Sequence, residues 1–202
     1  QVGFVGYTSQ KLYGPDDSDG TKLLRTGQEQ ITVLGEAFGA VRILGQTLTG
    51  YRQLVNRPFI NPRDNRMVPQ TFEAYTLTGS AKDISYTGGY ITKMKLRESD
   101  SFVWMSNTAG GTGSQKGVIY AGGTWDFVKN GYVKMDDQYG VDVFNTFYVE
   151  GKYPIAINDK TSLALGAQYY PQRSVGDEQI GSFSTWGMGL QAALAHGPVG
   201  VQ

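Results

Sequence analysis

The chain alternates apolar residues with polar or small residues over most of its length. In residues 161–171, for example, Leu163, Leu165 and Ala167 alternate with small or polar side chains. A period of two predicts β-strands that have one apolar face and one mixed face. No helical period longer than two turns is visible. We therefore predict an all-β fold with strands near residues 2–13, 28–38, 40–51, 71–79, 83–97, 117–127, 131–139, 143–156, 161–171 and 183–195, and a further strand that begins at Pro198.

The connections between these strands alternate in length. The long ones are residues 14–27, 52–70, 98–116 and 172–182. The short ones are Phe38-Gly39 and residues 80–82, 128–131, 157–160 and 196–197, and residues 138–142 form a short connection on the long-loop side. Within residues 128–131, Asn130-Gly131 is a strong hairpin signal. A meander with long loops at one end and short turns at the other is typical of outer-membrane barrels.

The strands are also long, with aromatic residues near their ends. Soluble sandwiches usually have strands of about five or six residues, whereas a strand that crosses a bilayer needs roughly nine to eleven. The aromatic residues, which fit interfacial girdles, are Tyr13, Tyr51, Phe72, Phe127, Tyr132, Tyr139, Tyr153, Tyr169, Phe183 and Trp186. We therefore predict an antiparallel up-and-down transmembrane β-barrel, with about ten strands in this chain. The alternative is a secreted carbohydrate-binding β-sandwich, in which tyrosine and tryptophan would stack on sugars.

The composition narrows the chemistry. The 202 residues include 18 Lys plus Arg and 18 Asp plus Glu, so the formal charge of zero gives no basic field for nucleic acid. Cysteine is absent and His196 is the only histidine, which argues against a catalytic triad and against thiolate or histidine metal sites. Asp16, Asp17 and Asp19 form a run too short for a calcium loop of the EF-hand type. We therefore expect that the protein is not an enzyme and that it holds no cofactor or metal. An outer-membrane hydrolase is the least favoured of the protein classes considered.

One loop concentrates positive charge. Four of the eight arginines fall within residues 51–72, and this stretch also holds Pro58, Pro62 and Pro69. Proline removes a backbone donor and fixes φ, so the segment is neither a helix nor a central strand. Clustered guanidinium groups on a stiffened loop suggest a device that holds an anion.

A row of cations is expected on one strand. In residues 83–97 one parity contains Ser85, Thr87, Lys93, Lys95 and Arg97, and the other contains Ile84, Tyr86, Tyr90, Met94 and Leu96. In a barrel wall the first set would line the lumen, with cations about 7 Å apart that pass an anion from site to site. Arg42 alternates with Val41 and would therefore add a fourth cation to the lumen. The alternative is a solvated strand edge on which lysine limits aggregation.

The arginine loop also resembles part of a known family. Residues 61–72 read NPRDNRMVPQTF, which resembles the D-x-R-L-L-P-Q-T-F segment of the OprD-type outer-membrane porins. Residues 86–99 resemble a strand of this family that ends in an R-N-S-like turn. The resemblance covers essentially the whole chain and implies an 18-stranded barrel of about twice this length. Residues 1–202 would then be a single β-barrel domain, incomplete at both ends, with residues 52–70 as its constriction loop.

The resemblance also implies a function. It implies a bacterial outer-membrane porin, in contact with outer-membrane lipid, that passes small anionic or carboxylate-bearing solutes through a lumen lined by basic residues, as a monomer or a loose homotrimer. Arg66 matches the arginine of the constriction loop, and Arg97 matches the arginine just after the lumenal strand. The candidate substrate-binding and pore-lining residues are Arg66, Arg97, Lys93, Lys95, Arg42, Arg63, Arg57 and Asp64.

Three residues depart from the family pattern. Met67-Val68 replaces the usual Leu-Leu, and Glu98 stands where the family often has asparagine. Glu98 places an anion beside Arg97. The resemblance therefore assigns no particular solute.

Overall fold

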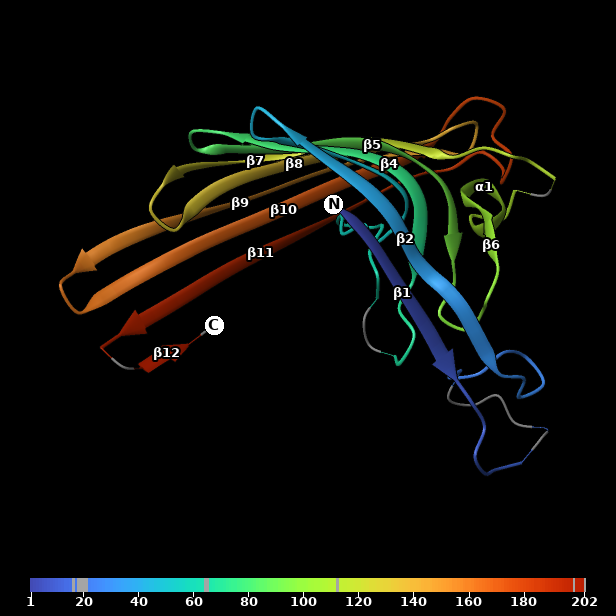
Figure 1. Ribbon diagram of the computed structural model, residues 1–202. Coiled ribbons are helices and arrows are strands. Elements are labelled where there is room, and N and C mark those ends of the chain that lie inside the picture. Colours follow the sequence, from blue (N-terminus) through green and yellow to red (C-terminus); the bar gives the residue numbers. More distant parts are fainter. Residues whose placement is uncertain (16, 18–21, 64–65, 112, 198, 202) are drawn as a thin grey trace.

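Each long strand pairs with a neighbour along the chain, so the alternating sequence folds into an antiparallel meander (Figure 1). The computed structural model describes residues 1–15, 17, 22–63, 66–111, 113–197 and 199–201. The elements are β1 (Val2–Ser9), β2 (Ile31–Ile43), β3 (Gln46–Gln53), β4 (Thr71–Ala81), β5 (Ile84–Lys95), β6 (Phe102–Trp104), α1 (Met105–Thr108), β7 (Val118–Val128), β8 (Gly131–Gly140), β9 (Phe144–Asn158), β10 (Thr161–Ser174), β11 (Ser184–His196) and β12 (Val199–Val201). Within the described residues these twelve strands form one sheet in sequence order, except that β6 pairs only with β5. The predicted all-β meander is confirmed.

Tight turns gather at one end of the sheet, on the left of Figure 1, and long loops gather at the other. The predicted turn at Phe38-Gly39 is wrong, because β2 continues through both residues to Ile43. The turn is at Leu44-Gly45, where φ is 50° and 80°. A tight hairpin of this kind needs positive φ at both central positions, which leucine rarely adopts. Leu44 therefore gave no turn signal in the sequence.

Other predicted boundaries shift by a few residues. The hairpin near Asn130 is confirmed, although its two-residue loop is Lys129-Asn130 and the next residue already belongs to β8. The sequence predicts a first strand that reaches residue 13, but β1 ends at Ser9, and the side chain of Tyr13 is fully exposed. The expected loop over residues 98–116 contains the short elements β6 and α1. The order of the strands was therefore predicted correctly, whereas several strand ends were not.

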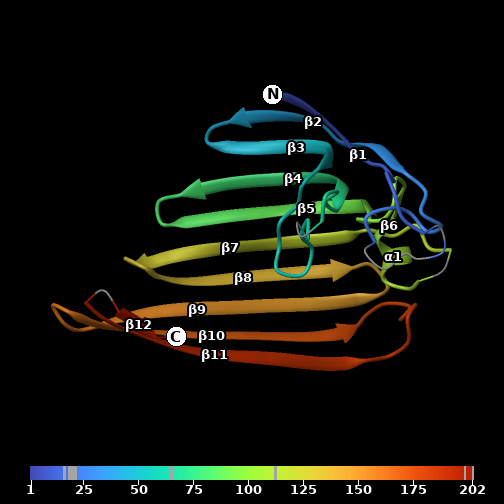
Figure 2. The ribbon, with the colours of Figure 1, turned by 90° about the horizontal axis from the view of Figure 1, so that it is seen from below.

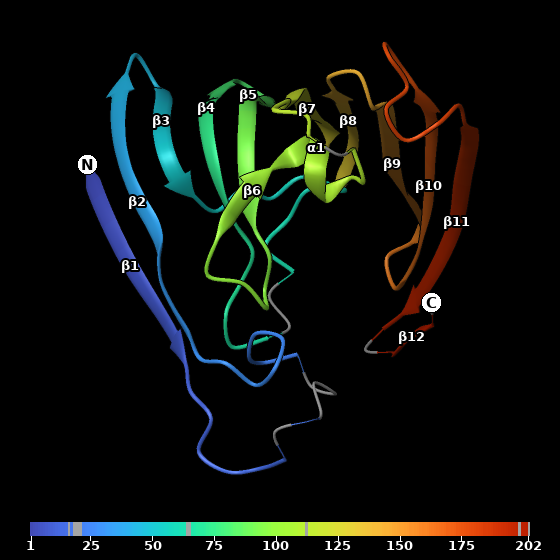
Figure 3. The same ribbon diagram turned by 90° about the vertical axis from the view of Figure 1, so that its right-hand side faces the viewer.

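The sheet is curved into an arch, and the long loops enter its concave side (Figure 3). Figure 2 shows the strands side by side from β2 to β11. Among the described residues, β1 and β12 end the sheet and do not pair with each other, so the arch is open. The strand expected after Pro198 is β12, although Pro198 itself lies outside the described residues. A single curved sheet is not a sandwich of two sheets, so the β-sandwich alternative is wrong.

The convex face of the arch is apolar. Val41 pairs with Leu48, and Leu48 pairs with Leu77; all three side chains are exposed. Other exposed apolar residues of this face are Tyr75, Tyr90, Ile119, Trp125, Met135, Phe147, Tyr153, Leu165, Tyr169, Trp186, Met188, Leu190 and Leu194. Aromatic rings adjoin one another here, for example Tyr169 and Trp186 at 6.2 Å between ring centroids. An apolar face of this extent with aromatic pairs is typical of the lipid-facing surface of a membrane barrel.

Two further findings concern the described residues. None of their helices is long and apolar enough to cross a membrane. Their His, Cys, Asp and Glu side chains form no group of three or more that could hold a metal ion.

Candidate functional site

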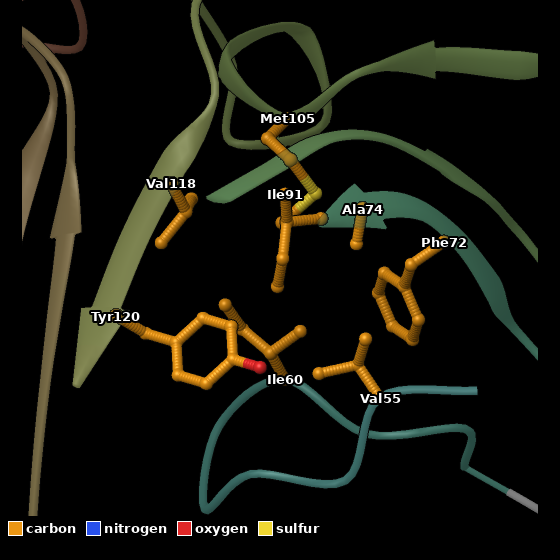
Figure 4. Packing of buried hydrophobic residues seen from close by; sticks show 8 residues of the cluster. All are labelled: Val55, Ile60, Phe72, Ala74, Ile91, Met105, Val118 and Tyr120. Atoms are coloured by element: carbon orange, nitrogen blue, oxygen red, sulfur yellow. The ribbon is translucent and has the colours of Figure 1, made fainter. Parts of the chain in front are cut away.

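The loop of residues 54–70 is described at residues 54–63 and 66–70. These parts leave the sheet after β3, lie over its concave face and return as β4 (Figure 2). Val55 and Ile60 of this loop are buried against side chains from β4, β5, α1 and β7 (Figure 4). The buried cluster consists of Val55, Ile60, Phe72, Ala74, Ile91, Met105, Val118 and Tyr120. Full burial of a side chain such as isoleucine contributes about 1.5–3 kcal/mol. Apolar contacts therefore hold the loop against the wall.

An ion pair holds the same loop to β8. The Arg57 Nε donates to Asp136 Oδ2 at 2.7 Å, and a second guanidinium nitrogen contacts the same oxygen. The Asp136 side chain is fully buried, and its other oxygen accepts from Gln138 Nε2 at 2.8 Å. Gly122 lies opposite Asp136 in the register, and a Cβ there would collide with both members of the pair. The charge of Arg57, which we expected to line the pore, is therefore paired with Asp136.

Phe59 fixes the loop still further along the wall. Its ring meets the ring of Tyr148 on β9 at 5.8 Å and that of Tyr170 on β10 at 5.4 Å between centroids. Both contacts have an edge-to-face geometry, which adds about 0.5–1.5 kcal/mol to the area buried. The sequence around Phe59 gives no sign of these contacts, because a lone aromatic residue does not show which rings it will meet.

Arg63 and Arg66 lie on the returning half of the loop. Arg63 is exposed and lines two hollows, of about 530 Å³ and about 310 Å³. Its φ of 45° is stabilised locally, because its backbone N–H donates to Asn61 Oδ1 at 3.0 Å. Arg66 is half-buried. Asp64, also expected here, lies outside the described residues.

The expected cation row on β5 is interrupted by a β-bulge. Ala74 pairs with Ile91 and Glu73 pairs with Lys93, so Thr92 is an extra residue on β5. A bulge changes which face the following side chains take. Ile91 therefore follows Ser85 and Thr87 on the concave face, and Lys93 does not. The expectation of one common face is therefore corrected, because strict alternation along a strand cannot reveal a bulge. It concerned Ser85, Thr87, Lys93, Lys95 and Arg97.

The two lysines beyond the bulge are engaged in the structure. Lys95 is fully buried, and its Nζ donates to the carbonyl oxygens of Pro69 at 2.8 Å and Leu96 at 3.0 Å. Lys93 lies 3.6 Å from a carboxylate oxygen of Glu73. Arg97 is half-buried and follows the end of β5 in the turn toward β6. Lys95 thus joins the ends of two loops and is not an open pore-lining cation in this chain.

Arg42 is placed as the alternation predicts. It pairs with Thr47, and the same row continues through Thr78, Thr87 and Gly122 to Asp136. Because Asp136 contacts the loop on the concave face, Arg42 lies on that face too. Its side chain is exposed, close to the turn that joins β2 and β3.

A polar cluster on β8–β10 was not predicted. Glu150 accepts hydrogen bonds from the hydroxyls of Tyr132, at 2.7 Å, and of Tyr148. Lys134 Nζ lies 5.8 Å from the centroid of the Tyr148 ring. The Tyr148 hydroxyl is also 3.1 Å from Gln168 Oε1. Polar residues at every second position of β8 and β9 carried the same signal as the β5 lysines and could have indicated this cluster.

Comparisons with known proteins agree with this geometry. A model of the family described as outer membrane porin, OprD family, matches residues 2–201. A search of curated proteins finds no match. Among solved structures, OpdK of Pseudomonas aeruginosa with vanillate has a TM-score of 0.81 at 18% identity, covering 96% of this chain and 52% of its own.

Two other solved structures are similar. A BenF-like porin from Pseudomonas fluorescens Pf-5 has a TM-score of 0.83 at 16% identity, covering 96% of this chain and 50% of its own. OccK2 (OpdF) of Pseudomonas aeruginosa in complex with glucuronate has a TM-score of 0.72 at 15% identity, covering 86% and 47%. The chain thus spans about half the length of these proteins. At these identities the likeness concerns the fold.

Proposed function

Because the chain belongs to the OprD family of outer membrane porins, we propose that it supplies wall and constriction to a channel for small carboxylate-bearing solutes. The observation that carries this proposal is the loop of residues 54–70, which crosses the concave face and is held at Arg57, Phe59 and Ile60. A loop fixed in this way narrows the space enclosed by the arch. The channel role requires no catalytic residue, and we assign no enzymatic activity.

The charge on this loop supports an anionic solute. Arg63 is exposed beside two hollows, Arg66 is half-buried nearby, and Arg42 is exposed on the same concave face. Guanidinium groups match carboxylates in a two-pronged geometry. OpdK was solved with vanillate and OccK2 with glucuronate, and both molecules carry a carboxylate.

Conduction also requires that binding be weak. A solute must bind well enough to enter and loosely enough to leave, and several modest sites achieve this better than one deep site. The exposure of Arg42 and Arg63 keeps their attraction for an anion small, because water screens exposed charges. The half-buried Arg57 would be a poor binding site for a passing anion, since its charge is already neutralised by Asp136.

Ion selectivity in planar bilayers tests the proposal, with protein expressed from its complete reading frame. Removing one exposed charge changes a nearby ion's energy by about 1 kcal/mol in water, or roughly fivefold in the anion-to-cation permeability ratio. We expect Arg42→Ala, Arg63→Ala and Arg66→Ala each to lower this ratio. Arg173→Ala is the matched control, because Arg173 is exposed and alternation places it on the convex face. Three variants that match this control would contradict the proposed pore role.

Location and assembly are further parts of the proposal. The apolar convex face suits contact with outer-membrane lipid, where members of this family reside. A homotrimer is proposed from the family resemblance alone. Sedimentation in a mild detergent tests it, and a single species of monomer mass would rule it out.

A further inference from the structure

A second hollow lies on the concave face at β8–β11, beside the strands that hold the tip of the loop. Its volume is about 300 Å³. The polar residues that line it are Tyr132, Glu150, Lys152, Gln168 and Gln191. None of these residues belongs to the arginine loop, and no role has yet been given to them.

The strand register explains why there is space here. One row runs from Lys134 through Glu150 and Gln168 to Gly189. The next row runs from Tyr132 through Lys152 and Gly166 to Gln191. Gly166 and Gly189 add no side chain to this face, so the polar groups around them face an opening.

The arrangement of donors and acceptors limits what can occupy the hollow. The Glu150 carboxylate has about four lone-pair positions, and two tyrosine hydroxyls use part of this capacity. Lys152 and the amides of Gln168 and Gln191 add donors around it. A hydroxyl group both donates and accepts, so it can bond to Glu150 and to a neighbouring donor at once.

The charges around the hollow are mixed. Glu150 repels a carboxylate and attracts a cation, whereas Lys134 and Lys152 do the reverse. A neutral polyhydroxylated surface bonds to groups of both signs, because each hydroxyl donates and accepts. The ring of Tyr132 adds an apolar face of the kind that packs on the C–H groups of such a molecule.

We propose that the hollow lined by Glu150, Gln168, Lys152 and Gln191 binds the hydroxyl-bearing part of a polyhydroxylated acid. This inference rests on the proposed function, in which the arginines attract the carboxylate end. We call this hollow the hydroxyl station. It adjoins the constriction loop, because Phe59 of the loop packs on Tyr148 and the Tyr148 hydroxyl donates to Glu150. Such a station favours hydroxylated acids over plain carboxylates of equal charge and length.

Gluconate and hexanoate are suitable probes, because both are six-carbon monoanions and only gluconate carries hydroxyls along its chain. Affinity for each is measured by titration calorimetry on the detergent-solubilised protein, expressed from its complete reading frame. We expect Glu150→Gln to weaken gluconate binding about tenfold, the loss typical of a hydrogen bond to a charged group. Hexanoate binding should be unchanged or slightly tighter, since a negative charge has been removed.

A second variant tests the hollow without changing charge. A Cβ at Gly166 would lie 3.4 Å from Gln191 Oε1, an ordinary contact, so Gly166→Ala should fold and place a methyl group in the opening. We expect it to weaken gluconate binding about threefold. Glu36→Gln is the matched control, because Glu36 also accepts from a tyrosine, Tyr7 at 2.6 Å, but on the distant strand β2. This control should leave gluconate binding unchanged.

The outcomes separate this inference from the proposed function. Equal loss of both acids in Glu150→Gln, or unchanged gluconate binding, overturns the hydroxyl station, and so does a wild-type protein that binds no gluconate. Bilayer recordings on the same protein test conduction independently. Selective gluconate binding by a protein that conducts no ions would support the station and contradict the channel.

Discussion

Arg57 shows how one neighbouring carboxylate changes the part that an arginine can play. In the sequence it is one of four arginines in a proline-rich stretch, and nothing nearby shows that it will be the one paired with a buried carboxylate. In the fold its side chain is 15% exposed and that of Asp136 is 0% exposed. Removal of one partner of a buried pair is costly, because the remaining charge has lost both water and its counter-ion. The ion pair therefore holds the loop in its position against β8.

We predict that Arg57→Met loosens residues 54–70. Loss of one partner from a buried ion pair costs about 3 kcal/mol or more. A cost of this size should raise the rate of tryptic cleavage at Arg63 and Arg66 by roughly two orders of magnitude, if cleavage follows local opening. Limited proteolysis of protein in lipid vesicles measures this rate, and single-channel recordings should show a noisier open level.

The double variant Arg57→Met with Asp136→Leu is the control for this prediction. Replacement of a whole buried ion pair by apolar side chains is often neutral for stability. The double variant should regain most of the protection against trypsin. If trypsin cleaved Arg57→Met alone at the wild-type rate, the prediction would be wrong. The apolar contacts of Val55 and Ile60 would then be sufficient to hold the loop.

Strand β5 shows where reasoning from the sequence ends. The alternation predicted its existence, its pairing with β4 and the exposure of Tyr90 on the convex face, because a half-buried strand needs that pattern. It could not predict that Thr92 is inserted as a bulge, since the pattern of Lys93 and Lys95 fits an uninterrupted strand equally well. The bulge is set by contacts with β4 and β6, which are properties of the fold.

The loop of residues 54–70 could also be predicted only in part. Its prolines and its place at the long-loop end were sufficient to predict an irregular segment with clustered charge. Its path across the arch depends on Asp136 and Tyr148, which follow much later in the chain. Contacts between distant segments leave no local signal in either segment.

We predict that Lys95→Met destabilises the protein without altering ion selectivity. The variant leaves the carbonyl oxygens of Pro69 and Leu96 without their ammonium donor, at a cost of about 1–3 kcal/mol. Urea unfolding in lipid vesicles measures the loss, and reversal potentials measure selectivity. Lys129→Met, in an exposed turn, should change neither quantity. A clear fall in anion selectivity in Lys95→Met would restore Lys95 as a pore-lining cation.

The arch as a whole separates two environments. Its convex side carries exposed leucine, methionine and aromatic side chains, whereas its concave side carries threonine, glutamine and charged groups. The alternation of the sequence predicted this division, because neighbouring residues of a strand point to opposite faces. The solved structures that share this fold are about twice as long as the chain.

We predict that Leu190→Arg strongly weakens the folded protein in a membrane. Leu190 is 76% exposed on the convex face of β11, and an arginine on the lipid face costs about 2–4 kcal/mol at the midplane. Thr185→Arg is the matched control, because alternation places Thr185 on the concave face of the same strand. The free energy of unfolding in vesicles should be lower for Leu190→Arg than for Thr185→Arg. Equal stability of the two variants would contradict the lipid-facing assignment.

The ion pair between Arg57 and Asp136 also has a consequence for timing. Its partners are separated by 79 residues, so the carboxylate is in place only after β4, β5, β7 and β8 have joined the sheet. Contacts between segments so far apart form late, because a long stretch of chain must be ordered first. The fixing of the loop against the wall is therefore a late step of folding. Until then the arginine loop remains open to proteases.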